Sequence, residues 1–108
     1  MNANPKYKNS IHSIAVIYIL KNELDSAIVY LNDVLKYYPD DLTEYPNFSF
    51  VYLTKKDYGK AKDYAQIGIE KDPTNPANYR NMAAAIYQLG DTSNAKKYWD
   101  KYTELGGK

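Results

Sequence analysis

Few side chains in this chain could do chemistry, and their spacing argues against catalysis and metal binding. His12 is the only histidine, and the chain contains no cysteine. A metal site needs several ligands, and a histidine base needs an orienting acid, but the helix predicted around His12 supplies neither. Asp40 and Asp41 fall in a predicted turn, where acids favour helix starts. No phosphate-binding glycine loop or serine-histidine-acid motif is present. We therefore predict a protein that is not an enzyme and uses no cofactor or metal.

Two asparagines, Asn47 and Asn81, are better candidates for contact with a ligand. They lie 34 residues apart, and both come early in predicted helices. An asparagine amide is both donor and acceptor, so it can pair with the backbone of an extended peptide whatever the peptide's sequence. The alternative interpretation is that both amides are simply solvated polar groups.

The same interval of 34 residues runs through the rest of the chain. Alanines recur at Ala27, Ala61 and Ala95. Three further series follow the same interval: Tyr30, Tyr64 and Tyr98; Ile14, Phe48 and Met82; and Ala15, Ser49 and Ala83. A fixed period of this length predicts stacked supersecondary units, which present an extended surface and rarely carry catalytic groups.

Each unit has the pattern of two helices. Apolar and small residues recur three and four apart, first over residues 11–20 and again over 27–35. The first helix of each copy is expected to stop at Asn22, Lys56 and Gly90. Gly90 and Asn22 suit a left-handed turn residue, whereas Lys56 must adopt that turn at some cost or avoid it. Thr43 is expected to start the third helix, which keeps Pro46 in its first turn.

Small residues explain how the two helices of a copy would pack. Ala15, Ser49 and Ala83 on first helices are expected to face Ala27, Ala61 and Ala95 on second helices. Small side chains at both places let the helix axes approach closely.

On these residues the chain resembles three tetratricopeptide repeats (TPRs). The third copy resembles the family pattern through Tyr79, Met82-Ala83, Gly90-Asp91, Ala95 and Trp99, and the second through Tyr45, Phe48-Ser49, Tyr52, Asp57-Tyr58, Ala61, Gly68 and Pro73. The first copy does so through Ile14-Ala15, Tyr18, Ala27, Val34 and Pro39. The resemblance implies an all-α fold, an α-solenoid of three hairpins in a short right-handed superhelix. It divides the chain into a tail (1–7) and repeats at 8–41, 42–75 and 76–108, with no separate C-terminal capping helix.

The resemblance also implies a concave groove lined by the first helices. The residues expected to line it and bind a peptide are His12, Val16, Asn47, Phe50, Arg80, Asn81, Ala84 and Tyr87. Family members that hold the C-terminal carboxylates of heat-shock chaperones use lysines, asparagines and an arginine there. The matching positions hold His12, Val16, Asn47, Ala77 and Asn81, of which only Asn47 fits, so we do not expect chaperone-tail binding.

Phe50, Tyr87 and Val16 make the expected groove more apolar than charged. One interpretation is a site for an amphipathic helix or an apolar peptide stretch. The other is that these side chains pack mainly on their neighbours. The partner predicted from the groove is a protein or peptide.

The charge balance bears on the other classes of partner. Lysine and arginine total 14 against 13 acids, so no basic field would attract nucleic acid or an anionic membrane. The first residues lack a signal-peptide pattern, and the apolar run at 14–20 is too short to span a bilayer. A cytoplasmic location is favoured but not established by this.

Both ends of the predicted array carry apolar residues without an evident cover. The first helix is apolar on nearly all sides, and the last carries Tyr98, Trp99 and Tyr102. Large exposed apolar patches mark interfaces. The alternative function is therefore a structural segment that self-associates through Ile17, Tyr98, Trp99 and Tyr102, or a fragment of a longer protein.

Overall fold

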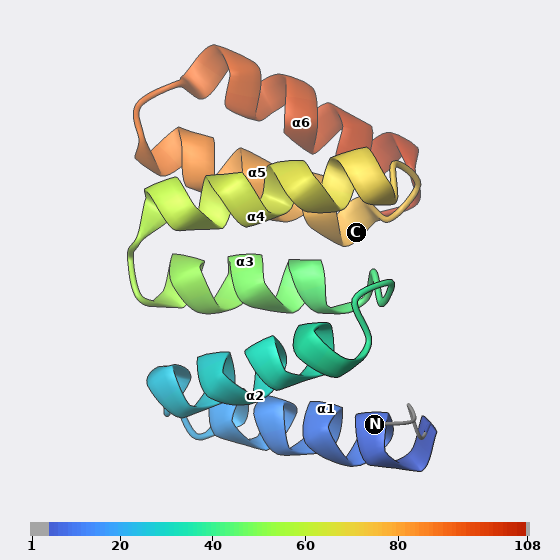
Figure 1. Cartoon of the computed structure of the whole chain (residues 1–108). Helices are drawn as coiled ribbons and strands as arrows, with labels where there is room; N and C mark the ends of the chain where they lie inside the picture. The colour runs from blue at the N-terminus through green and yellow to red at the C-terminus, as the bar shows by residue number, and fades with distance from the viewer. Residues whose placement is uncertain (1–4, 108) are drawn as a thin grey trace. The chain divides into compact units, whose positions relative to one another are not determined.

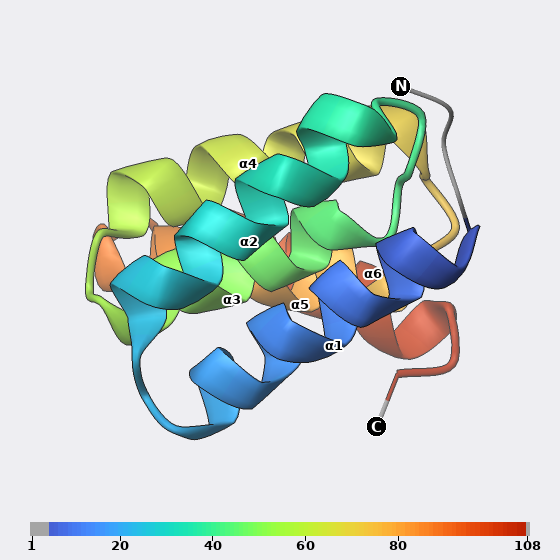
Figure 2. The ribbon, with the colours of Figure 1, turned by 60° about the horizontal axis from the view of Figure 1, so that its bottom comes forward.

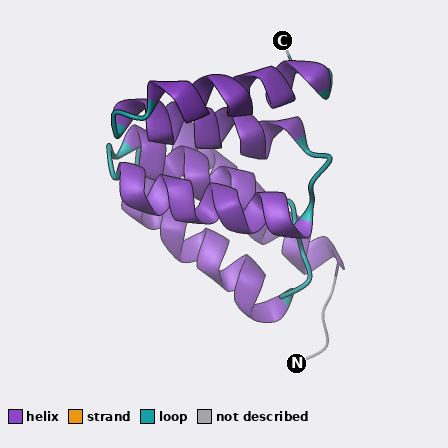
Figure 3. Cartoon of the chain, turned by 90° about the horizontal axis from the view of Figure 1, so that it is seen from above, coloured by secondary structure: helices purple, strands orange, loops and turns teal. Residues whose placement is uncertain are grey.

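A computed structural model describes residues 5–107, with side chains from Ser10 onward. Over these residues the chain forms helices and short loops, without a strand (Figures 1 and 3). The helices are α1 (Pro5–Leu20), α2 (Leu24–Tyr37), α3 (Glu44–Thr54), α4 (Tyr58–Lys71), α5 (Pro76–Gln88) and α6 (Thr92–Glu104). Within the described residues the chain forms two compact units, which divide between Glu44 and Tyr45. The all-α class is confirmed, and α1 begins earlier than expected, inside the segment predicted as a tail.

The turns that end the first helix of each hairpin follow the 34-residue period. Asn22, Lys56 and Gly90 have φ angles of 60°, 64° and 97°. The amide that follows each of them donates to a carbonyl in the last turn of the helix, as Asp57 N does to Tyr52 O at 2.9 Å. The left-handed turn is therefore confirmed at all three positions, including Lys56, where a non-glycine side chain makes it costly.

Two helix starts in the second unit are capped by side chains. Asn75 Oδ1 accepts from Ala77 N at 3.0 Å, and Pro76 is the first residue of α5. The Asp91 carboxylate accepts from both the side chain and the backbone N–H of Asn94, and these hydrogen bonds lower the pKa of Asp91. α3 begins one residue after Thr43, with Pro46 in its first turn, as expected.

In the first unit, α1 and α2 form a helical hairpin (Figure 2). Ala15 and Ala27 are both fully buried, and Leu31 and Val34 of α2 are buried with them. The Tyr18 and Tyr30 rings stack at 5.4 Å between centroids. The small residues thus occupy the tight helix contact, and aromatic rings fill the space beside it.

In the second unit, the α3–α4 contact is closed by a hydrogen bond between the paired small residues. Ser49 Oγ donates to Ala61 O at 2.8 Å, and both residues are fully buried. The Tyr64 ring stacks on Phe48 at 4.7 Å and on Tyr52 at 5.5 Å. Burial in this stack, with the neighbouring Tyr52, raises the pKa of the Tyr64 hydroxyl. The serine therefore adds a directional link where the other copies have alanine.

The contact between α4 and α5 depends on a position without a side chain, Gly68. Ala65 packs with Met82, Ile86 and Ala95 in one apolar cluster. A Cβ built on Gly68 would overlap the Asn78 amide, whose Nδ2 would lie 2.8 Å away. α5 can therefore lie against α4 only because position 68 has no side chain.

Candidate functional site

A groove of about 430 Å³ lies between α5 and α6, on the second unit. We call it the α5–α6 groove, and it is lined by Arg80, Ala83, Ala84, Tyr87 and Gln88 of α5 and by Thr92, Ala95, Lys96 and Trp99 of α6. Three alanines occupy its lining, so the space that larger residues would fill is open. A groove of this size and shape suits an apolar side chain or one face of a helix.

The groove has exposed aromatic rings and a cationic rim. Tyr87 is 60% exposed and Trp99 is 47% exposed, although both are large and partly apolar. Arg80 is exposed, and Lys96 Nζ pairs with Asp100 at 3.0 Å on the surface of α6. Because solvent screens an exposed pair of this kind, the apolar lining is the part of the groove whose burial would release the most free energy.

Several residues expected to contact a peptide do lie at this groove. Arg80, Ala84 and Tyr87 all line it. Phe50 on α3 is 44% exposed. Asn47 on α3 and Val16 on α1 are half-buried. Whether these residues bind a ligand stays a prediction.

Asn81 is placed differently from the expectation. It is only 1% exposed, and its Nδ2 donates to Pro46 O at 3.0 Å. The amide therefore satisfies a carbonyl in the first turn of α3 instead of facing solvent beside Arg80. This hydrogen bond links α5 to the first turn of α3, so the amide of Asn81 has a structural role.

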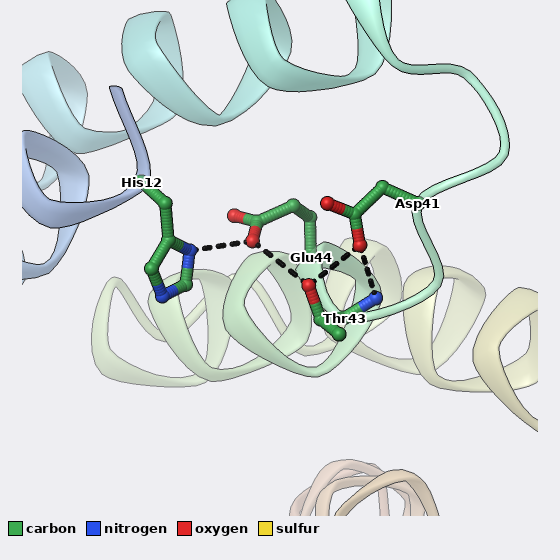
Figure 4. Close-up of polar contacts among 4 residues, drawn as sticks. All are labelled: His12, Asp41, Thr43 and Glu44. Carbon is green, nitrogen blue, oxygen red and sulfur yellow. Dashed lines mark hydrogen bonds and ion pairs between the residues drawn. The ribbon is translucent and has the colours of Figure 1, made fainter. Parts of the chain in front are cut away.

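His12 also has a partner that its own helix could not reveal. Its Nδ1 lies 2.6 Å from Oε1 of Glu44, the first residue of α3 (Figure 4). The Glu44 side chain is almost fully buried, and its Oε2 has no partner among the described residues. Thr43 Oγ1 lies 2.6 Å from Asp41 Oδ1 and 3.2 Å from Glu44 Oε1. His12 thus anchors a buried carboxylate, a role that leaves its Nδ1 unavailable to a ligand.

The four residues considered for self-association fall into two groups. Ile17 and Trp99 are exposed, whereas Tyr102 is buried. Tyr98 is half-buried and packs against the apolar cluster that contains Met82 and Ala65. The Trp99 and Tyr102 rings contact each other with centroids 4.9 Å apart. Only Ile17 and Trp99 therefore have surface to offer a partner.

The α6 wall of the groove was not foreseen. Thr92, Ala95 and Lys96 were not expected to face a ligand, because only first helices were expected to line the groove. A usable signal was present in the period: Ala84 stands where Phe50 stands one copy earlier, and the smaller residue opens space toward α6.

Other kinds of site were sought in the same residues. Within the described chain, no three histidine, aspartate or glutamate side chains gather closely enough to hold a metal ion. Among those residues, no helix combines the length and apolar character needed to cross a bilayer.

Comparison with known proteins identifies the fold. Residues 9–41 match the family pattern "Tetratricopeptide repeat". Among solved structures, the first TPR of Spaghetti (RPAP3), bound to the HSP90 peptide SRMEEVD, superposes with a TM-score of 0.89 at 17% identity, covering 98% of this chain and 84% of that one. The Sgt2 TPR domain from Aspergillus fumigatus gives 0.89 at 20% identity over 97% and 71% of the two chains. MamA AMB-1 gives 0.80 at 19% identity over 94% and 60%.

The fold class is therefore established. The chain has the all-α solenoid fold of these tetratricopeptide-repeat domains, residues 9–41 match one such repeat, and the helices correspond to about three repeats. The exact repeat boundaries within it, at 42 and 76, stay a prediction.

Proposed function

We propose that this chain is a non-catalytic protein-interaction module whose α5–α6 groove binds an apolar face of a partner helix or peptide. The observation that carries the proposal is the groove itself, an open space of about 430 Å³ with alanine lining and exposed Tyr87 and Trp99 at its walls. Exposed apolar surface of this kind gains free energy when a partner covers it.

The comparisons support the general kind of function. The TPR of Spaghetti was solved with an HSP90 peptide, and a TPR2AB domain of yeast Sti1 was also solved with HSP90 material, so this fold serves as a peptide-binding scaffold in those proteins. Fold likeness at this identity does not carry the ligand across.

The ligand proposed here differs from an acidic chaperone tail. Positions that hold the carboxylate clamp in such family members carry Val16 and Ala77 here, and neither can donate a hydrogen bond from its side chain. The side-chain amide of Asn81 is hydrogen-bonded to Pro46 O, and the His12 ring is hydrogen-bonded to Glu44. A partner with an apolar stripe fits the groove better than one recognised by its terminal carboxylate.

A displayed library of random 16-residue peptides tests the proposal. Binders selected on the whole chain are measured by calorimetry against the parent, Ala84→Phe and Lys97→Phe. Ala84→Phe fills the groove, whereas Lys97 is exposed on α6 and does not line it, so the second variant controls for an added surface ring. We expect at least a tenfold loss of affinity in Ala84→Phe, about 1.4 kcal/mol, and no change in Lys97→Phe.

The peptide SRMEEVD serves as a comparison ligand in the same experiment. We expect no saturable binding of it. Saturable, salt-sensitive binding of SRMEEVD, or selected binders that ignore Ala84→Phe, would contradict the proposal.

A further inference from the structure

The surface of α4 on which α5 docks is made of small residues where the two helices meet. Ala65 of α4 packs with Met82 and Ile86 of α5. Gly68 of α4 leaves room for the Asn78 amide of α5. Small residues at these two places let the axes of the two helices approach closely.

The equivalent places on α6, beside the α5–α6 groove, hold two large aromatic residues. One period of 34 residues after Ala65 and Gly68 stand Trp99 and Tyr102, whose ring centroids lie 4.9 Å apart. A Cβ on Gly107 would overlap the Tyr102 ring, so the turn that follows α6 packs here as well. A partner helix therefore cannot lie along α6 as α5 lies along α4, and the open space of the groove is left for an inserted side chain.

The charged residues that line the groove are all positive. They are Arg80 and Lys96, and the described lining contains no acid. Lys96 Nζ already pairs with Asp100 at 3.0 Å. Arg80 is exposed, and none of the ion pairs among the described residues includes it. A partner that covers the groove would leave this arginine without a counter-charge unless the partner brings an acid.

Arg80 lies at the Trp99 end of the groove, one helical turn from the alanines in its middle. The Tyr79 and Tyr98 rings, each one residue before Arg80 and Trp99, have centroids 6.4 Å apart. Ala84 follows Arg80 by four residues, which is about 6 Å along α5. A side chain seated over Ala84 and an acid opposite Arg80 would thus stand about one turn apart on a partner helix, a spacing of three or four residues.

We propose that the α5–α6 groove binds a helical segment of another protein that carries a bulky apolar residue and an acidic residue one turn away. The apolar side chain fills the space over Ala84 and Ala95, and the carboxylate accepts hydrogen bonds from the Arg80 guanidinium. The inference rests on the proposed function of the groove and names the chemistry of its partner. Arginine suits this role because its planar guanidinium can donate to both oxygens of one carboxylate.

This contact differs from the carboxylate clamp of the chaperone-binding family members. The clamp positions on α5 hold Ala77 and Asn81, and the Asn81 amide is hydrogen-bonded to Pro46 O. Arg80 stands at neither position, and the acid that it meets is a side chain within a helix instead of a chain terminus. The seven-residue peptide SRMEEVD is too short to form a stable helix of this kind.

A double-mutant cycle between the groove and a peptide tests the inference. The strongest binder from the peptide selection is synthesised with an amidated C-terminus, and its acid one turn from the apolar residue is replaced by glutamine. Calorimetry compares both peptides on the parent, on Arg80→Gln and on Lys97→Gln, a control at an exposed cation of α6 that does not line the groove. The change at Arg80 or the change in the peptide should each weaken binding about fivefold, and the two together should weaken it no further. Lys97→Gln should bind as the parent does.

Salt and spacing provide two further readouts of the same pair. Raising sodium chloride from about 50 mM to about 500 mM should weaken the parent complex and leave the Arg80→Gln complex nearly unchanged. Moving the peptide's acid to two residues from the apolar residue should cost as much affinity as removing it, because residues two apart lie on different sides of a helix.

Binders that carry no acid three or four residues from the apolar residue, or that bind Arg80→Gln as tightly as the parent, would overturn the inference. Equal affinity with the acid two residues away would also overturn it. If such binders still lose affinity in Ala84→Phe, only the acidic partner is refuted and the groove keeps its proposed function. Binders insensitive to Ala84→Phe would refute the proposed function itself.

Discussion

Replacing Gly68 with alanine should destabilise the second unit, although alanine is the better helix former. Gly68 lies inside α4, where the change to alanine alone should gain about 1 kcal/mol. Against this, the new methyl group would overlap the buried Asn78 amide of α5. Overpacking of a closed contact costs about 1–3 kcal/mol. The net expectation is a loss of up to about 2 kcal/mol in the free energy of unfolding.

Gly59 provides a matched control in the same helix. A Cβ there would meet only Asp57 Oδ1, at 4.0 Å, so Gly59→Ala should stabilise the protein by roughly 0.5–1 kcal/mol. The assay is urea unfolding followed by circular dichroism at the helix band, with the slopes compared to check that both variants unfold alike. The difference between the two glycine variants isolates the steric contribution.

The Asn78→Ala background makes the test sharper. Without the amide, the methyl group at position 68 has room, so Gly68→Ala should change sign and become stabilising there. Gly68→Ala that stabilises the parent as much as Gly59→Ala does would refute the close α4–α5 approach.

Three further results are expected. Ala61→Leu should cost about 1–3 kcal/mol in the same urea assay, because Ala61 is fully buried at the α3–α4 contact; an unchanged midpoint would contradict that packing. His12→Ala should cost about 1–3 kcal/mol by leaving the buried Glu44 carboxylate without its hydrogen bond, and Glu44→Gln in that background should recover part of it. The hydrogen bonds from Asn94 lower the pKa of Asp91, so their stabilising effect is present above the usual aspartate pKa of 3.8 and is lost as the pH falls below it. The melting-temperature difference between the parent and Asp91→Ala should therefore shrink between pH 7 and pH 3, and a constant difference would argue against the cap.

The features that sequence predicted well are those fixed by local chemistry. The left-handed turns at Asn22, Lys56 and Gly90 follow from a constraint within four residues, and the period repeats it. Ala61 faces Ser49 because two helices that pack tightly need small side chains at the contact, and both residue types are visible without a structure.

The features that sequence missed depend on contacts between distant segments. Glu44 lies 32 residues from His12, and the sequence around either residue does not predict that the two side chains pair. Asn81 was expected to face a ligand because its spacing from Asn47 matched the period, but the docking of α5 against Pro46 decided its role. A period identifies equivalent positions; it does not say which of them a neighbouring helix will cover.

The central claim, that the α5–α6 groove binds a partner helix, can be tested most directly at Trp99. It is the only tryptophan of the chain and forms one wall of the groove, so its fluorescence reports on that surface alone. Quenching by acrylamide should fall when a saturating selected peptide is added to dilute protein. A quenching constant that stays the same with bound peptide would contradict the claim.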